Sequence, residues 1–137
     1  MRVYVDTSAL LRRVLAADTH DSAAERYLAE RNAAGDTLES SLLARIETER
    51  ALRARRPPVG YDLAAAVDAT LAGLGIVALT EDVAKTAASI GPDALRSLDA
   101  IHVATAKLDE VDAFVTDDMR QAAAATANGV AVVMPGT

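Results

Sequence analysis

The chain has 137 residues, of which 51% are hydrophobic; this is enough for one domain with a substantial core and excludes a disordered protein. It has no cysteine and two histidines, which excludes disulfide bonds, a thiolate zinc site and a cysteine nucleophile, and disfavours a multi-histidine zinc site. The 20 acidic and 14 basic residues give a net charge of −6. This argues against nucleic-acid binding through bulk charge, unless the acids surround a divalent metal ion.

Short apolar strands alternate with helices along the whole chain. In chain order we expect a strand at 3–5, helices at 9–16 and 21–34, a short extended piece at 37–40, helices at 41–56 and 63–71, a strand at 76–79, a helix capped by Thr80 that ends near Ile90, a helix at 98–108 capped by Ser97, a strand at 113–116, a helix at 119–127 and a strand at 130–133. This alternation predicts an α/β fold with a mostly parallel central sheet and helices on both faces. No repeat or linker divides the chain, so residues 1–137 are expected to form a single domain.

No apolar run is long enough to cross a bilayer, and the first residues lack the apolar stretch of a signal peptide. We therefore expect a cytoplasmic protein that does not contact a membrane.

Acidic residues follow two of the predicted strands. Asp6 comes directly after the first strand, and Asp117 and Asp118 follow the strand at 113–116. Each could be an ordinary helix cap, but ligands of parallel sheets bind beyond the carboxyl ends of the strands. Two such ends in one short domain therefore predict a shared acidic site.

A third acid, Asp99, lies in the first turn of a helix that is otherwise almost entirely apolar or small, apart from His102. A carboxylate there either gains from the helix dipole or binds a metal ion, and the residues alone do not decide between the two. For His102, a hydrogen-bonded place in the core is expected rather than metal ligation.

The helix at 41–56 offers two further acids. Glu47 and Glu49 both lie at edges of its apolar stripe, so periodicity does not choose between them. The same helix holds the densest basic run of the chain, which is either a solvated face or a phosphate-binding edge; its members are Arg45, Arg50, Arg53, Arg55 and Arg56.

Three hydroxyl side chains stand next to the strand-end acids. Thr7, Ser8 and Thr116 could cap helices, or they could orient a carboxylate or a metal-bound water.

Four motifs then occur in a fixed order. They are Asp-Thr-Ser at 6–8, Glu-x-x-Arg-Ala-Leu at 47–52, Leu-Asp-Ala-Ile-His-x-Ala-Thr-Ala at 98–106 and Phe-Val-Thr-x-Asp at 114–118. This order resembles the PIN-domain ribonucleases, specifically the VapC-type toxins of bacterial toxin–antitoxin pairs. The resemblance covers residues 3 to about 133.

The resemblance implies a PIN-like fold and an Mg²⁺-dependent endoribonuclease, with Mn²⁺ able to substitute. It implies that the catalytic acids are Asp6, Glu47, Asp99 and Asp118. Of these, Asp6, Asp99 and Asp118 would bind metal; Asp117, which fills a position usually held by another residue, could share the role of Asp118. Thr7, Ser8 and Thr116 take the places of residues that orient these acids. Arg50, Arg53 and Arg56 would contact RNA or an antitoxin.

The family also implies partners: an RNA substrate cut in single-stranded regions, a cognate VapB-type antitoxin and a second copy of the chain. Carboxylates without thiolates suit a hard cation such as Mg²⁺.

Three other classes compete with this interpretation. A phospho-receiver domain would carry its acidic pair after the first strand and a lysine after a late strand, unlike this chain. A haloacid-dehalogenase-type phosphatase would need a second aspartate where Ser8 stands. A PIN-like module that binds RNA or a partner without cutting it is the third alternative, which the presence of all four acids disfavours.

Overall fold

The computed structural model describes residues 1–15 and 22–136. Its five strands form one sheet in the order β3-β2-β1-β4-β5, and every neighbouring pair is parallel. The strands are β1 (Arg2–Val5), β2 (Thr37–Ser41), β3 (Gly75–Val77), β4 (Ala113–Val115) and β5 (Val132–Val133). The chain's first strand is therefore the central one, and the residue that follows it lies in the middle of the sheet's carboxyl edge.

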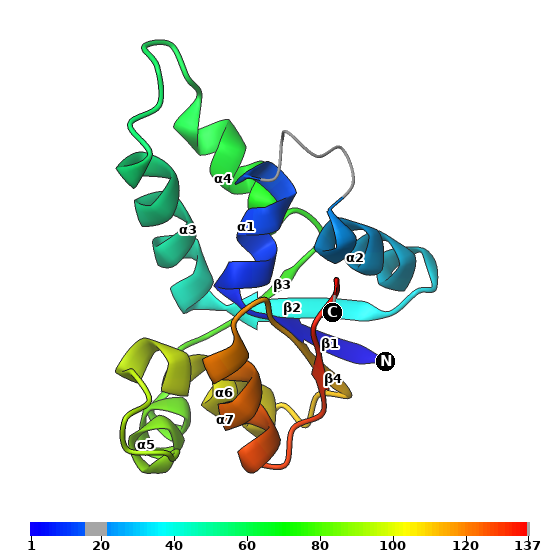
Figure 1. Cartoon of the computed structure of the whole chain (residues 1–137), viewed down its shortest axis with the longest axis vertical. Helices are drawn as coiled ribbons and strands as arrows, with labels where there is room; N and C mark the ends of the chain where they lie inside the picture. The colour runs from blue at the N-terminus through cyan, green and yellow to red at the C-terminus, as the bar shows by residue number, and fades with distance from the viewer. Residues whose placement is uncertain (16–21, 137) are drawn as a thin grey trace.

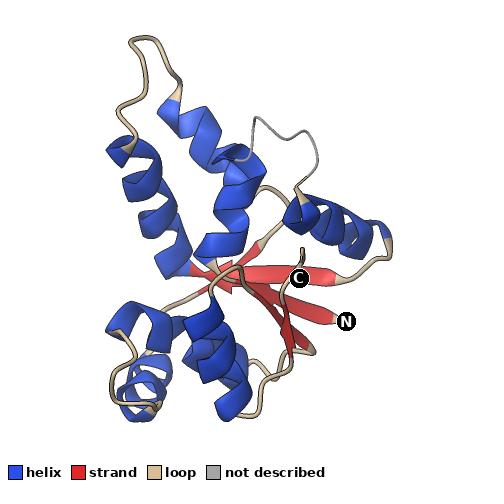
Figure 2. Ribbon diagram, viewed as in Figure 1, coloured by secondary structure: helices blue, strands red, loops and turns tan. Residues whose placement is uncertain are grey.

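Seven helices are present in the described residues, and they cover both faces of the sheet (Figures 1 and 2). On one face lie α1 (Thr7–Leu15), α2 (Ala23–Ala33), α3 (Leu42–Ala54) and α4 (Leu63–Leu71). On the other lie α5 (Glu81–Ser89), α6 (Ser97–Leu108) and α7 (Met119–Ala127). The predicted α/β architecture is confirmed, and the sheet is parallel throughout.

The alternation of side chains along β1 divides the interior into two cores. Val3 and Val5 point into an aliphatic core beneath α1 to α4, and Tyr4 points into a core beneath α5 to α7. Tyr4 stacks on Phe114 of β4, with ring centroids 5.3 Å apart. The second core is otherwise rich in alanine from α6 and α7, and side chains this small let helices lie close to a sheet.

Several predicted boundaries shift by a few residues. The strand expected at 76–79 is found at 75–77, and that expected at 130–133 is reduced to 132–133. Ser97 is the first residue of α6 and not its cap; Arg96 holds the cap position and makes no side-chain capping bond. The predicted helix ends at Ala16 and Asp21 lie outside the described residues.

The helix predicted at 41–56 is α3, which begins after Ser41 and ends at Ala54. The Ser41 Oγ accepts a hydrogen bond from the Leu43 backbone N–H, which supports the start of the helix. The chain then turns before Pro57, where Arg56 adopts a left-handed conformation with φ of 50°. Within the part of the chain that the structure describes, no helix combines the length and apolarity needed to cross a bilayer.

Candidate active site

Four acidic side chains from separate elements line one pocket of about 280 Å³ at the carboxyl edge of the sheet. The pocket, called the acid pocket below, is lined by Asp6, Thr7, Ser8, Leu11, Glu47, Ala51, Asp99, His102 and Asp118. The structure thus brings together the four acids that the family resemblance picked out, although they lie in four separate segments of the sequence. Parallel strand ends and the helix starts beside them meet at this edge, which explains the convergence.

Asp6 lies at the bottom of the acid pocket and is only 4% exposed. Its Oδ1 accepts hydrogen bonds from the Ser8 hydroxyl at 2.7 Å and from the Ala9 backbone N–H at 3.2 Å, and its Oδ2 accepts one from the Thr116 hydroxyl at 2.7 Å. Burial raises the pKa of Asp6, while the nearby His102 and these hydrogen bonds act against the rise. The hydroxyls of Ser8 and Thr116 therefore fix the orientation of the carboxylate, one of the two roles that the sequence left open for them.

Glu47 projects from α3 into the same pocket, and a chain of hydrogen bonds fixes its position. Its Oε1 accepts a hydrogen bond from the Thr7 hydroxyl at 2.7 Å and lies 2.6 Å from Nε2 of His102. On the other side of the ring, Nδ1 of His102 lies 2.5 Å from the Tyr4 hydroxyl. Because a carboxylate can only accept, the contact with Glu47 needs a proton on Nε2 of His102.

The protonation of this chain follows from its surroundings. Burial raises the pKa of Tyr4, so the phenol keeps its proton. Burial also acts to raise the pKa of Glu47, but the hydrogen bond and charge of His102 and the Thr7 hydroxyl outweigh it and hold this pKa below its ordinary value. His102, 2% exposed and bonded at both nitrogens, has the satisfied core position expected from the sequence.

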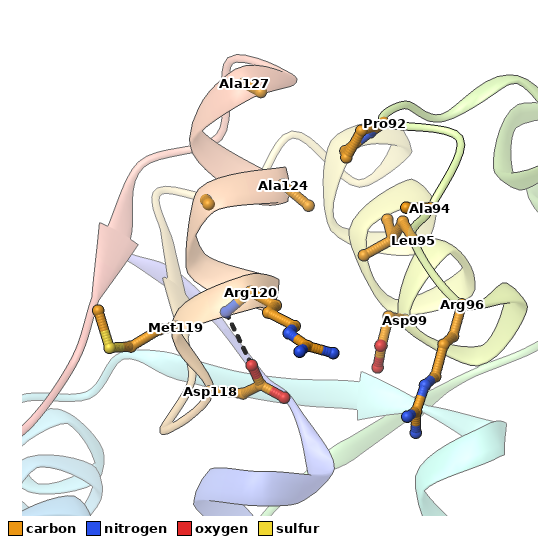
Figure 3. Close-up of a pocket in the computed structure, with 11 residues that line it drawn as sticks. Pro92, Ala94, Leu95, Arg96, Asp99, Asp118, Met119, Arg120, Ala124 and Ala127 are labelled. Carbon is orange, nitrogen blue, oxygen red and sulfur yellow. Dashed lines mark hydrogen bonds between the residues drawn. The ribbon is translucent and has the colours of Figure 1, made fainter.

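Asp99 and Asp118 face each other across the mouth of the acid pocket, from the first turn of α6 and the start of α7 (Figure 3). Burial raises the pKa of Asp99, and the charge of Asp118 raises it further. The Oδ1 of Asp118 also caps α7, because it accepts from the backbone N–H groups of Arg120 at 2.8 Å and Gln121 at 3.3 Å. The capping and site interpretations of Asp118 are therefore compatible.

Asp117 is not among the residues that line the acid pocket, and the structure does not favour its sharing the role of Asp118. Its Oδ2 forms an ion pair with the guanidinium of Arg12, at 2.6 Å. Its backbone N–H donates to the Ser8 hydroxyl at 2.9 Å, so the main chain of Asp117 supports the pocket while its side chain is directed elsewhere.

The arginines of α3 are likewise absent from the lining of the acid pocket. Arg50 lines a separate depression between α3 and α4, and Arg53 pairs with Glu49 at 3.6 Å on an exposed surface. Arg56 lies beyond the end of α3, at the end of the helix that is distant from the sheet (Figure 1). Periodicity could not choose between the two glutamates of α3. In the structure Glu47 lines the acid pocket, and Glu49 lies on the outer surface.

The carboxylates suit a hard divalent cation that keeps much of its water. Burial raises the pKa of Asp6 and Asp99, and the charges of Asp118 and Glu47 raise that of Asp99 further, a cost that a bound cation would offset. Among the described residues, no three acidic or histidine side chains are close enough to enclose an ion by themselves. Mg²⁺ needs only one or two carboxylates and retains several waters, so this looser arrangement fits it better than it fits zinc.

Two arginines beside the acids were not found by sequence reasoning. Arg96 and Arg120 line a larger groove of about 1040 Å³ that shares Asp99 and Asp118 with the acid pocket (Figure 3). Each lies within three residues of one of these acids in the sequence, a signal that the density of basic residues does not capture.

Comparisons with known proteins agree with this geometry. A family model described as "PIN domain" matches residues 3–127. "Ribonuclease VapC47" of Mycobacterium tuberculosis (strain CDC 1551 / Oshkosh) is 35% identical over 136 residues, which cover 98% of this chain and 97% of the relative.

Two solved structures share the fold at low sequence identity. VapBC2 from Rickettsia felis, bound to a DNA fragment from the promoter, has a TM-score of 0.77 at 13% identity and covers 98% of this chain and 99% of its own. A toxin-antitoxin complex from Klebsiella pneumoniae has a TM-score of 0.65 at 19% identity, with coverage of 88% and 90%.

Proposed function

Because the chain belongs to the PIN-domain family, and within it to the VapC ribonuclease toxins, we propose that it is itself a divalent-metal-dependent endoribonuclease that acts as the toxin of a toxin–antitoxin pair. The observation that carries the proposal is the convergence of Asp6, Glu47, Asp99 and Asp118 in one pocket. The phospho-receiver alternative lacks its lysine, because neither Lys85 nor Lys107 lines this pocket.

We assign metal binding to Asp6, Asp99 and Asp118, with Mg²⁺ as the expected ion and Mn²⁺ as a substitute. A bound Mg²⁺ would activate a water molecule for attack on the phosphodiester and stabilise the charge that develops on the phosphate. Asp6 is held for this role by the Ser8 and Thr116 hydroxyls, so it needs no reorientation when the ion binds.

Glu47 is assigned as the group that accepts the proton from the attacking water. Its lowered pKa keeps the carboxylate ionised at neutral pH, as a base must be. Thr7 and His102 both bind Oε1, and this holds the side chain in place while Oε2 has no hydrogen bond to any described residue. The water proton would move to Glu47 as the new phosphorus–oxygen bond forms, and the leaving oxygen would take up a proton from solvent as its bond to phosphorus breaks.

Three partners follow from the same proposal. The substrate is single-stranded RNA, and action on cellular RNA places the protein in the cytoplasm. A VapB-type antitoxin inhibits the toxin, supported by the toxin-antitoxin complex among the structural neighbours. A homodimer is the expected assembly. The exposed Arg50, Arg53 and Arg56 are proposed to contact the antitoxin, because they lie outside the acid pocket.

The test is to map the 5′ ends of cellular RNA after a short induction of the wild type and of the Asp6→Asn and Glu49→Gln variants. We expect new ends at discrete sites with the wild type and with Glu49→Gln, whose carboxylate lies outside the acid pocket. Asp6→Asn should produce none. Identical sets of ends from the wild type and Asp6→Asn would contradict the proposed function.

A further inference from the structure

Arg96 and Arg120 flank the two acids at the mouth of the acid pocket. In Figure 3, Arg120 extends from α7 toward Asp99, and Arg96 runs beside Asp99 from the residue before α6. Both arginines are exposed, and both line the groove of about 1040 Å³ that continues from Asp99 and Asp118 between α7 and the loop before α6. We call this the arginine groove.

The guanidinium groups of these two arginines have no carboxylate within ion-pair distance in residues 1–15 and 22–136. Other arginines of the chain do have one, as the pairs of Arg12 with Asp117 at 2.6 Å and Arg13 with Glu25 at 3.1 Å illustrate. The charge of Arg96 lowers the pKa of Asp99, but neither Arg96 nor Arg120 forms an ion pair with a carboxylate of the described residues. They leave two positive groups available to an anionic ligand that also reaches the acid pocket.

The walls of the arginine groove are apolar, and most of their side chains are small. Pro92 and Leu95 form one wall, and Ala123, Ala124 and Ala127 of α7 form the other. Among the residues that the structure describes, no aromatic side chain lines the groove, and both Tyr4 and Phe114 are fully buried in the core beneath it. A planar ligand here would therefore lie against apolar side chains and guanidinium planes, two surfaces against which nucleobases can pack.

We propose that the arginine groove is the subsite for the nucleotides next to the scissile bond: Arg96 and Arg120 bind the flanking phosphates, and the alanine wall of α7 receives the adjacent base. The proposal rests on the proposed ribonuclease function. An RNA strand is favoured over a peptide because the groove shares Asp99 and Asp118 with the acid pocket, so a strand cut there has a continuous path past both arginines. A chain with one negative charge per residue would pair with both of them.

The experiment measures the affinity of a fluorescent single-stranded 10-nucleotide RNA of mixed sequence, in Mg²⁺, as a function of salt. All proteins carry Asp6→Asn to prevent cleavage; Asp6 does not line the arginine groove. Arg96→Gln, Arg120→Gln and the double variant are compared with Lys107→Gln, which removes a cation at the opposite end of α6. Circular dichroism checks that each variant is folded.

Each lost phosphate contact should lower the slope of log K against log salt by about 0.7 in magnitude, so the double variant should lose about 1.4. Lys107→Gln should keep the parental slope. Unchanged slopes in all the arginine variants would overturn the proposal. Unchanged RNA binding together with weaker binding of the cognate antitoxin would also overturn it, because the groove would then belong to a protein partner.

A second comparison separates base from phosphate. Ala123→Leu fills the exposed wall of the groove without changing its charge, and Ala65→Leu adds the same bulk to the exposed surface of α4. Ala123→Leu should weaken binding of the RNA about fivefold or more, but not of an abasic oligomer of equal charge; Ala65→Leu should change neither. Equal effects of Ala123→Leu on both oligomers would overturn the base-binding part.

Failure of the subsite and failure of the ribonuclease function give different results. If the wild type without Asp6→Asn cuts the RNA in Mg²⁺ while the groove variants bind normally, only the subsite is wrong. If the wild type neither binds nor cuts RNA, both are wrong.

Discussion

The acid pocket and the arginine run of α3 are both rich in charge, but they are assembled in opposite ways. The pocket takes single acids from four separate segments, and the sheet topology brings them to one edge. The arginine run is one continuous stretch, and its side chains point in different directions because successive residues on a helix are rotated by about 100°. Convergence in space, not density in sequence, distinguishes the two.

The energetic consequences differ in the same way. In the pocket, burial raises the pKa of Asp6 and Asp99, and neighbouring carboxylates raise that of Asp99 further, so the folded chain holds charges that it does not fully stabilise by itself. On the outer surface of α3, Glu49 and Arg53 make an exposed pair one helical turn apart, which changes stability little. We therefore expect substitutions in the pocket to act on chemistry and those in the run to act weakly, if at all, on the same reaction.

The largest effect is expected from removing the pocket's acids or its metal ion. Asp99→Asn and Asp118→Asn should each lower the RNA cleavage rate by more than about 100-fold, because loss of a metal ligand removes several kcal/mol of charge stabilisation. EDTA should abolish cleavage by the wild type, and excess Mg²⁺ should restore it. Cleavage that persists after chelation and dialysis would rule out the metal mechanism. The measurement is single-turnover cleavage of a labelled RNA.

The two glutamates of α3 give a matched pair for the next largest effect. Glu47→Gln should lower the cleavage rate by about 10² to 10⁴, the usual range for a lost general base, while Glu49→Gln should stay within about twofold of the wild type. Both variants remove one charge from the same helix, so general electrostatic effects cancel in the comparison. If Glu49→Gln lowered the rate more than Glu47→Gln, the proton-accepting role assigned to Glu47 would be wrong.

The choice between these glutamates shows where sequence reasoning stops. The strand-end acid Asp6 was predictable, because a buried strand followed by an acid at the carboxyl edge of a parallel sheet has a fixed place in the fold. Glu47 was selected only by family resemblance; its position at the edge of the apolar stripe depends on how α3 packs, and helix periodicity does not fix that rotation.

Roles were harder still to predict for adjacent residues and for residues that only folding brings together. Asp117 and Asp118 differ by one position, and only the ion pair with Arg12 and the cap of α7 separate their roles. Arg96 precedes α6 and Arg120 lies in α7, and the two line one groove only in the folded chain. Periodicity and local motifs do not predict which residues from separate segments will lie close together.

Smaller effects are expected on the stability of the metal-free protein, and they should have opposite signs for substitutions of Asp99 and Glu47. The pKa of Asp99 is raised in the folded state, so its charge costs stability at neutral pH and this cost disappears as pH falls through the raised pKa. In EDTA at pH 7, Asp99→Asn should therefore increase the free energy of unfolding by up to about 1 kcal/mol, a modest value because water screens this partly exposed group. The gain should shrink toward acid pH.

Glu47 should behave in the opposite way. Its pKa is lowered in the folded state, so it contributes stability above its ordinary pKa that is lost as pH falls through the lowered value. Glu47→Gln should therefore destabilise the protein at pH 7. Thermal unfolding from pH 4 to 8 measures both variants, and Mg²⁺ should stabilise the wild type more than Asp99→Asn, which lacks a proposed metal ligand. Stabilisation by both substitutions would contradict the roles assigned to Thr7 and His102.

The adjacent aspartates give a finer comparison. Asp117→Asn breaks a partly exposed ion pair with Arg12, so it should lower the free energy of unfolding by less than about 1 kcal/mol and leave the cleavage rate within about twofold. Arg12→Gln is its control and should have the same small effect on stability. A loss of cleavage in Asp117→Asn as large as that in Asp118→Asn would show that the two carboxylates share the metal.

The smallest effect is expected at Arg53, where the two charged regions can be separated most directly. Arg53→Gln removes an i,i+4 partner of Glu49, worth about 0.3 to 0.5 kcal/mol of stability, and takes away a cation outside the acid pocket. Its RNA affinity and salt slope should match those of the parent protein, whereas binding of the cognate antitoxin should weaken. Arg56→Gln tests the same surface beyond the end of α3. If either variant lowers the RNA salt slope by about 0.7, the strand extends along α3 and the arginine run joins the RNA path after all.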